Sequence, residues 1–183
     1  MINIIKKQTK WLITSFALLL ITGCSSMNIN EYAGTKPEFK LFDYFAGKTY
    51  ATGQFQDRSG KVIRRFTVDI TGTISKDNKH ITLDERFVYD DGEKQQRIWK
   101  ITETSPHHFI GLADDVIGKA VGESVGNALN WRYVLDLPYK DGTIHVNFDD
   151  WMFMHSAHTM INRAQVTKWG FNVGEVTLFF SKQ

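Results

Sequence analysis

The chain has 183 residues, of which 42% are apolar and 23% are charged, with one Cys and three Pro. This composition excludes a disordered, collagen-like or disulfide-rich chain, and the length suits a single domain. The 22 Lys and Arg exceed the 20 Asp and Glu by two, but residues 1–23 hold three Lys and no acid, which leaves 19 basic and 20 acidic residues in the rest. A net charge of −1 there does not predict a nucleic-acid-binding surface.

Residues 1–23 have the pattern of a secretory signal peptide. Three Lys precede the apolar run of residues 11–21, which is shorter than the roughly 20 residues of a membrane-spanning helix. The segment ends with the sequence ITGC at residues 21–24, which resembles the bacterial lipobox. The resemblance implies that Cys24 becomes the acylated first residue of the mature protein, and Ser25 after it implies an outer-membrane anchor with the domain facing the periplasm. A plain secreted protein with an incidental Cys24 is the alternative.

Residues 24–39 are predicted to form a lipidated tether that is flexible at first. They lack clear periodicity and contain Gly34 and Pro37. Apolar residues become dense from Leu41, so residues 40–183 are expected to form a single folded domain. Because Cys24 is the only cysteine, this domain is expected to depend on packing for its stability.

From Gly47 to the end of the chain the dominant period is two, which is typical of half-buried strands. Short segments rich in Asp, Asn and Gly separate nine predicted strands: 48–56, 61–74, 80–89, 93–103, 107–113, 127–137, 143–153, 158–169 and 174–181. A meander of this length avoids open edges by closing on itself. The sequence therefore predicts an all-β, antiparallel up-and-down barrel of about 8–10 strands, with a β-sandwich as the alternative. The outward faces carry Lys, Arg, Asp and Thr, so the barrel is not expected to span a membrane.

Residues 114–126 interrupt this pattern. Gly118, Gly122 and Gly126 recur every four residues, and each would cost a helix about 1 kcal/mol relative to Ala. The segment is predicted to be one short Gly-rich helix or a loop. It is either a mobile lid over the barrel mouth or a membrane-contacting element, or else a crossover packed closely on the barrel wall.

Several long stretches carry a resemblance to a known family: QDRSGKVIRRFTVDITGT, FVYDDGEKQQRIW, ADDVIGKAVGESVGNALNWRYVLDLP, FDDWMF and INRAQVTKWGFNVGEVTLFF. Over residues 40–181 the chain resembles bacterial lipoproteins of the domain of unknown function 3833 family, which implies a Gram-negative envelope lipoprotein and no particular reaction. A looser similarity is to lipocalin-like (calycin) barrels. The sequence FAGKTY at residues 45–50 leads into the first strand as their Gly-x-Trp does, with Tyr50 in place of the Trp.

Strand parity predicts which side chains face the interior. Gly92 suits the left-handed position of a three-residue hairpin loop with a G1 bulge. That loop sets Tyr89 opposite Glu93 and, further along, Glu85 opposite Arg97, so that apolar residues meet apolar residues on the same face. The only charged pair facing inward in this hairpin is then opposite in sign.

The candidate ligand-binding residues are the charged and aromatic side chains predicted to face inward: Arg64, Glu85, Arg97, Trp131, Tyr133, Phe148 and Asp150. Strand pairing is expected to set Arg64 opposite Gly53 and Asp150 opposite Trp131. Inward charges must be paired, hydrated or bound to a ligand. They either form a polar floor that holds the carboxylate or phosphate head of an amphipathic ligand, or form a self-satisfied ion-pair network that closes the barrel.

The leading hypothesis is a non-enzymatic lipoprotein that binds a hydrophobic or amphipathic, lipid-derived small molecule inside the barrel. An envelope enzyme acting on lipid or acyl chains and a filled structural or partner-binding barrel are the alternatives. No nucleophile elbow, phosphate-binding loop or dinucleotide motif is present. His155 and His158 would point to opposite faces of a strand. The sequence therefore predicts no metal site, no cofactor and no nucleic-acid partner, and it does not establish whether the protein has protein partners.

Overall fold

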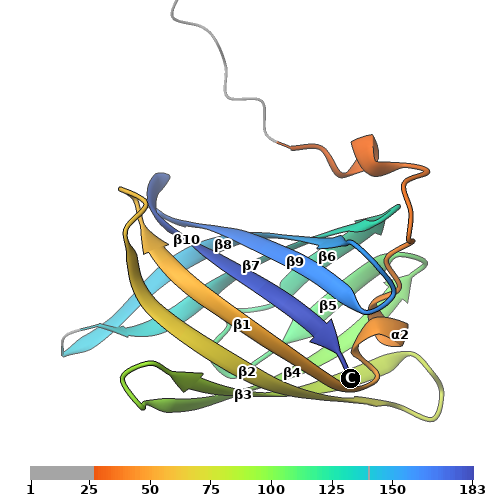
Figure 1. Cartoon of the computed structure of the whole chain (residues 1–183), viewed down its shortest axis with the longest axis horizontal. Helices are drawn as coiled ribbons and strands as arrows, with labels where there is room; N and C mark the ends of the chain where they lie inside the picture. Colours follow the sequence, from red (N-terminus) through yellow and green to blue (C-terminus); the bar gives the residue numbers. More distant parts are fainter. Residues whose placement is uncertain (1–26, 140) are drawn as a thin grey trace, which may run out of the picture.

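The computed structural model describes residues 27–139 and 141–183, so the predicted signal peptide and Cys24 lie outside the described residues. Within them, ten antiparallel strands follow one another around a closed barrel, and β10 pairs with β1 (Figure 1). The strands are β1 (Gly47–Asp57), β2 (Val62–Ile74), β3 (His80–Tyr89), β4 (Lys94–Ser105), β5 (His108–Leu112), β6 (Ala120–Val125), β7 (Ala128–Tyr139), β8 (Gly142–Met154), β9 (Thr159–Lys168) and β10 (Phe171–Lys182). The predicted up-and-down barrel is confirmed, and the sandwich alternative is not.

The alternation of side chains between core and solvent explains why these segments form the wall. In β9, for example, Met160, Asn162, Ala164 and Val166 are buried at every second position, and the residues between them face outward. Each of the nine predicted ranges coincides with an observed strand to within a few residues. The period-two pattern therefore determines both the strands and the interior face.

The tenth strand corrects the prediction for residues 114–126. Residues 113–119 form a loop in which Gly118 has a φ of +69°, and β6 follows as a strand instead of a helix. Gly122 of β6 lies opposite Trp131, and a Cβ at Gly122 would be 2.1 Å from the Trp131 ring. The glycine is needed because the indole occupies the space of a side chain, so the four-residue spacing of the glycines is not a helical stripe.

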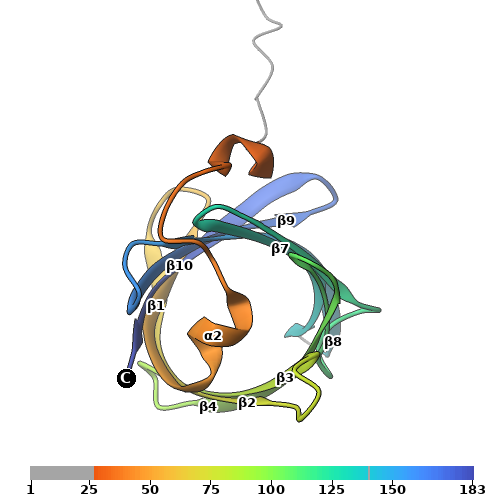
Figure 2. The same ribbon diagram turned by 90° about the vertical axis from the view of Figure 1, so that its right-hand side faces the viewer.

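The short helix α2 (Leu41–Phe45) closes one end of the barrel, where Figure 2 shows it inside the ring of strands. Its apolar residues pack in the core. The side chain of Lys182, at the end of β10, binds the carbonyl oxygens at the end of the helix. The Nζ of Lys182 donates hydrogen bonds of 2.9, 2.6 and 2.8 Å to the carbonyl oxygens of Asp43, Tyr44 and Ala46. Within the described residues, no helix is long and apolar enough to cross a membrane.

The segment before α2 is folded against the outside of the barrel. A 3₁₀ helix, η1 (Ile29–Tyr32), contacts β6 and β7, and the ring centroid of Tyr32 lies 5.2 Å from that of Phe153. The backbone N–H of Asn127 donates a 2.9 Å hydrogen bond to Thr35 Oγ1. Within the segment that the sequence assigns to the tether, residues 27–35 thus pack on the wall, Phe39 is buried in the core, and residues 24–26 lie outside the described residues.

Candidate functional site

The interior of the barrel contains a cavity of about 740 Å³. Leu41 and Phe45 of α2 line it at the closed end. At the opposite end, the lining residues Tyr139 and Val173 are 53% and 37% exposed, so the cavity reaches solvent there. We call this end the mouth. Most of the lining is apolar and comes from the inward-facing residues of β1–β4 and β7–β10.

All seven predicted site residues line this cavity: Arg64, Glu85, Arg97, Trp131, Tyr133, Phe148 and Asp150. They come from β2, β3, β4, β7 and β8, so strands that are distant in sequence bring them to one space. The structure does not place them in a single cluster. It divides them into an aromatic wall, two polar groups part-way along the strands, and one arginine at the mouth.

The aromatic wall is built from inward-facing side chains of β4, β7 and β8. The rings of Tyr133 and Phe148 are stacked, with centroids 5.0 Å apart and an interplanar angle of 9°. The Trp99 ring contacts those of Trp131 and Tyr133 edge-on, at centroid distances of 5.7 and 5.5 Å. These contacts fix the ring orientations and give the cavity a rigid apolar surface.

Arg97 is held by two carboxylates. The predicted register of the β3–β4 hairpin is confirmed: Glu85 is opposite Arg97, and Gly92 in the hairpin loop has a φ of +86°. The Arg97 Nη1 lies 4.0 Å from Glu85 Oε2. Its closer partner is Asp115 of the 113–119 loop, which accepts hydrogen bonds from Nε at 2.9 Å and from Nη2 at 2.7 Å. The loop, whose backbone is bonded to β7 at Val134 and Asp136, thus neutralises a charge that faces the cavity.

Asp150 has a different environment. It lies opposite Trp131, as predicted, and it is 6% exposed. Asn162 Nδ2 donates to its Oδ1, and the hydroxyl of Tyr133 lies 3.5 Å from its Oδ2, at the limit of a hydrogen bond. None of the described Lys, Arg or His side chains forms an ion pair with Asp150. The carboxyl group of Asp150 is therefore buried without a compensating cation.

Burial shifts the proton equilibria of these groups. Burial raises the pKa of Glu85 to about 7, although the charge of Arg97 opposes the shift. Burial also raises the pKa of Asp150 to about 7, opposed by the hydrogen bond from Asn162 and reinforced by the charge of Glu85. The pKa of Tyr133 lies well above its ordinary value for the same reason, so this side chain stays a hydrogen-bond donor. The cavity thus contains two carboxyl groups that titrate near neutral pH.

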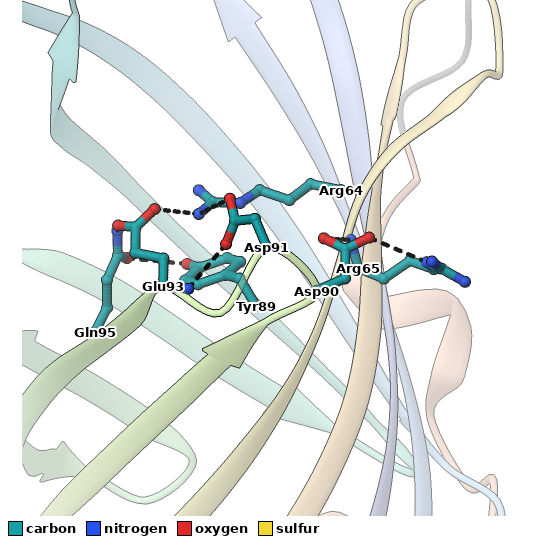
Figure 3. A network of polar contacts seen from close by, with 7 residues as sticks. All are labelled: Arg64, Arg65, Tyr89, Asp90, Asp91, Glu93 and Gln95. Atoms are coloured by element: carbon teal, nitrogen blue, oxygen red, sulfur yellow. Dashed lines mark hydrogen bonds and ion pairs between the residues drawn. The ribbon is translucent and has the colours of Figure 1, made fainter.

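At the mouth, Arg64 forms a polar network with the β3–β4 hairpin (Figure 3). Its guanidinium lies over the ring of Tyr89, 3.6 Å from the centroid, and pairs with Glu93 and, at 3.2 Å, with Asp91. Gln95 joins the network by donating to Glu93 at 2.6 Å and accepting from the Tyr89 hydroxyl at 2.9 Å. The network connects β2 to the β3–β4 hairpin at the cavity rim.

The predicted partner of Arg64 was wrong. The β1–β2 loop closes between Asp57 and Lys61, and the register shifts again between Phe55 and Gln56. Arg64 therefore lies opposite Phe55, and Gly53 lies opposite Phe66. A Cβ at Gly53 would be 2.9 Å from the Phe66 ring. The space left by the glycine therefore accommodates a phenyl ring instead of the guanidinium.

Two functional candidates were missed from the sequence. Asp115 gave no signal, because only the folded 113–119 loop brings it to Arg97. Asn162 did give one, because it alternates with the buried Met160 and Ala164, and an amide on such a face must find a partner. Within the described residues, no group of three or more His, Cys, Asp or Glu side chains is placed to hold a metal ion.

A family profile described as "Protein of unknown function (DUF3833)" matches residues 18–182. The chain belongs to this family. No curated protein sequence matches it significantly.

Comparison with solved structures concerns the fold alone, because the sequence identities are low. An S-type phycobiliprotein lyase from Guillardia theta is similar with a TM-score of 0.58 and 8% identity, over 78% of this chain and 90% of that chain. A DUF3598-family protein from Nostoc punctiforme is similar with a TM-score of 0.49 and 8% identity, over 81% of this chain and 51% of that chain. A de novo designed fluorescence-activating β-barrel is similar with a TM-score of 0.42 and 13% identity, over 79% of this chain and 99% of that chain. The similarity to the lyase agrees with the closed strand order, and the DUF3833 chain has the fold of a lipocalin-like β-barrel.

Proposed function

We propose that this DUF3833 protein is an envelope lipoprotein that binds a hydrophobic or amphipathic, lipid-derived small molecule inside the barrel. The observation that carries the proposal is the cavity of about 740 Å³, apolar over most of its lining and open at the mouth. Small-molecule sites have volumes of roughly 300–1,000 Å³, apolar walls and a few convergent polar groups. The cavity has each of these properties, whereas a purely structural barrel would have an interior filled by side chains.

Binding is tested on the purified protein with the fluorescent dye Nile red and by native mass spectrometry for co-purified lipid. Val176, a half-buried lining residue of β10, offers a blocking variant, because Val176→Trp inserts an indole into the cavity. The matched control is Val121→Trp on the outer face of β6, where Val121 is 40% exposed. We expect dye uptake by the wild type and the control, and reduced uptake by Val176→Trp. Absence of both dye uptake and co-purified lipid in the wild type would contradict the proposal.

The membrane anchor is the second part of the proposal, and the ITGC sequence at residues 21–24 supports it. Acylation of Cys24 would attach several chains, each contributing about 0.8 kcal/mol per buried CH₂. Wild-type protein is expected to incorporate labelled palmitate and to fractionate with the outer membrane, whereas Cys24→Ser is expected to do neither. Wild-type protein that takes up no palmitate would show that the anchor is wrong, without affecting the cavity.

A second candidate, an envelope enzyme acting on lipid or acyl chains, is favoured by one observation. Asp150 is a buried carboxyl group in the cavity whose pKa is raised to about 7, near the value that suits a general acid or base. The candidate is tested by incubating the wild type and Asp150→Asn with phospholipid vesicles and analysing the products. Product formed by the wild type and not by Asp150→Asn would favour the enzyme, and bound but unchanged lipid would favour the binder.

A further inference from the structure

The two arginines that line the cavity are already paired. Arg97 donates hydrogen bonds from Nε and Nη2 to the carboxylate of Asp115 and lies 4.0 Å from Glu85. Arg64 pairs with Asp91 and with Glu93 at the mouth. Each guanidinium thus faces two carboxylates before any ligand arrives. An anionic head group would have to displace a carboxylate and leave it without its cation, so these arginines are poorly suited to recognise a fatty acid or a phosphate.

In contrast to the paired arginines, the acceptor atoms around Asp150 are not fully used by partners within the protein. Asp150 lines the cavity, and its Oδ2 has only the 3.5 Å contact from Tyr133. Asn162 also lines the cavity and is 1% exposed, and its Oδ1 has no hydrogen-bond partner. A buried oxygen without a donor is unfavourable, and a ligand that supplies an N–H or O–H removes the deficit. Two neighbouring side chains therefore offer spare acceptor capacity in a cavity whose lining is mostly apolar.

The charges around Asp150 add to this preference. The groups that interact with it electrostatically are Glu85 of β3 and its own neighbour Asp149, while Tyr133 of β7 is neutral and donates to it. Beyond them, Arg97 of β4 is the one cation near this part of the described cavity wall, and Asp115 already binds it. Ionising both Glu85 and Asp150 thus produces an excess of negative charge. A ligand ammonium group would offset this excess, while a ligand carboxylate would increase it.

We propose, on the basis of the small-molecule binding proposed above, that the cavity selects amphipathic molecules whose polar end donates hydrogen bonds and carries no negative charge. A primary amine is preferred over an alcohol, and an alcohol over a carboxylate. The polar end lies at Asp150 and Asn162, and the apolar chain occupies the aromatic and aliphatic remainder of the cavity.

The experiment compares three molecules with the same apolar chain. Dodecylamine, 1-dodecanol and dodecanoate compete with Nile red for the full protein at pH 7.5. We expect the amine to compete at least 10-fold more strongly than the carboxylate, with the alcohol between them. The variant Asp150→Asn removes the charge with little change in shape, and we expect it to reduce the amine-to-carboxylate ratio about 10-fold. The control Asp69→Asn removes an exposed charge from the outer face of β2, and we expect a change of less than about 2-fold.

A second measurement on the wild type keeps the proposal testable if Asp150→Asn does not fold. Between pH 5.5 and 8, Glu85 and Asp150 lose their protons while dodecylamine stays cationic, so amine affinity should rise several-fold and dodecanol affinity should stay nearly constant. Tightest binding of dodecanoate, or selectivity unchanged by Asp150→Asn, would overturn this proposal and leave the binding function intact. A wild type that takes up neither Nile red nor any of the three molecules would instead contradict the proposed function itself.

Discussion

The two ends of the barrel are stabilised in different ways. At the closed end, Phe45 of α2 is 4% exposed and Lys182 bonds three carbonyl oxygens of the same turn. At the mouth, Trp169 and Phe171 in the β9–β10 hairpin are 84% and 74% exposed, and the hairpin connecting β3 to β4 is held by ion pairs near solvent. The closed end is therefore stabilised mainly by apolar burial, and the mouth mainly by ion pairs that solvent screens.

This difference indicates which end is able to move. Burying an aromatic side chain contributes several kcal/mol, whereas an exposed ion pair contributes little and is weakened by salt. Regions with few buried apolar contacts are the ones that open locally at low cost. The mouth is thus expected to deform when a ligand enters, while the closed end remains folded. Four predictions test this comparison.

The largest expected effect is at the closed end. Phe45→Ala removes a ring that contacts Tyr44 and Phe180 at centroid distances of 5.1 and 6.0 Å. We expect the free energy of unfolding in urea to fall by about 3–5 kcal/mol, because truncating a buried Phe leaves a cavity. The matched control at the mouth is Phe171→Ala, for which we expect a change within about 0.5 kcal/mol. Equal losses at both ends would refute the comparison.

The second effect concerns Arg97, which links the cavity wall to the 113–119 loop. Arg97→Met leaves Glu85 and Asp115 without their shared cation, and we expect a loss of about 3 kcal/mol in the free energy of unfolding. A double-mutant cycle with Asp115→Asn should give a coupling energy above about 1 kcal/mol. Additive losses would show that the bidentate contact does not stabilise the loop.

The third effect is the pH dependence caused by Asp150. Its pKa is raised in the folded state to about 7 from 3.8, so the folded protein holds this proton more tightly than the unfolded chain does. The stabilisation is complete below pH 3.8 and is lost as the pH rises towards 7 and above. The measured quantity is the free energy of unfolding in urea of the wild type minus that of Asp150→Asn. We expect this difference to decrease by on the order of 2 kcal/mol from pH 5 to pH 7.5. A difference that stays constant or increases would contradict the assignment.

The smallest effect on stability is expected at the rim of the mouth. Arg64→Met breaks the contacts with Glu93 and Asp91 while keeping an apolar stem over Tyr89. We expect the Tm to change by no more than about 4 °C and the rate of Nile red uptake to increase several-fold. The control Arg65→Met removes the neighbouring guanidinium, which is 71% exposed and pairs with Asp90. Its uptake rate should match that of the wild type, and a slower rate in Arg64→Met would argue against a role for this network in access.

The sequence predicts the parts of the barrel that depend on local alternation and turn chemistry. Gly92 and the apolar positions around Glu85 and Arg97 are sufficient for the register of one hairpin, because a shift by one residue would expose its core face. The same reasoning fails at Arg64, where a bulge between Phe55 and Gln56 changes the register without a sequence signal. It also fails for β6, because the glycine opposite Trp131 interrupts the alternation of apolar side chains by which a strand is predicted.

The site is predictable only where strand parity determines it. The inward charges on β3, β4 and β8 follow from alternation, whereas Asp115 reaches Arg97 through a loop whose path depends on the whole fold. Of the two alternatives for the inward charges, the self-satisfied ion-pair network agrees better with the contacts of Arg97. The carboxylate that pairs with Arg97 belongs to Asp115, which lies in a segment without strand periodicity.

The packing of residues 27–35 on the outer wall limits the distance between the barrel and a bilayer. For a chain acylated at Cys24, as proposed above, only three residue spacings separate the lipid from Met27, a reach of about 10 Å at most. Met27 leads directly into η1, which lies against the side of the barrel formed by β6 and β7 (Figure 1). Such a short connection would hold the side of the barrel formed by β6 and β7 close to the bilayer surface.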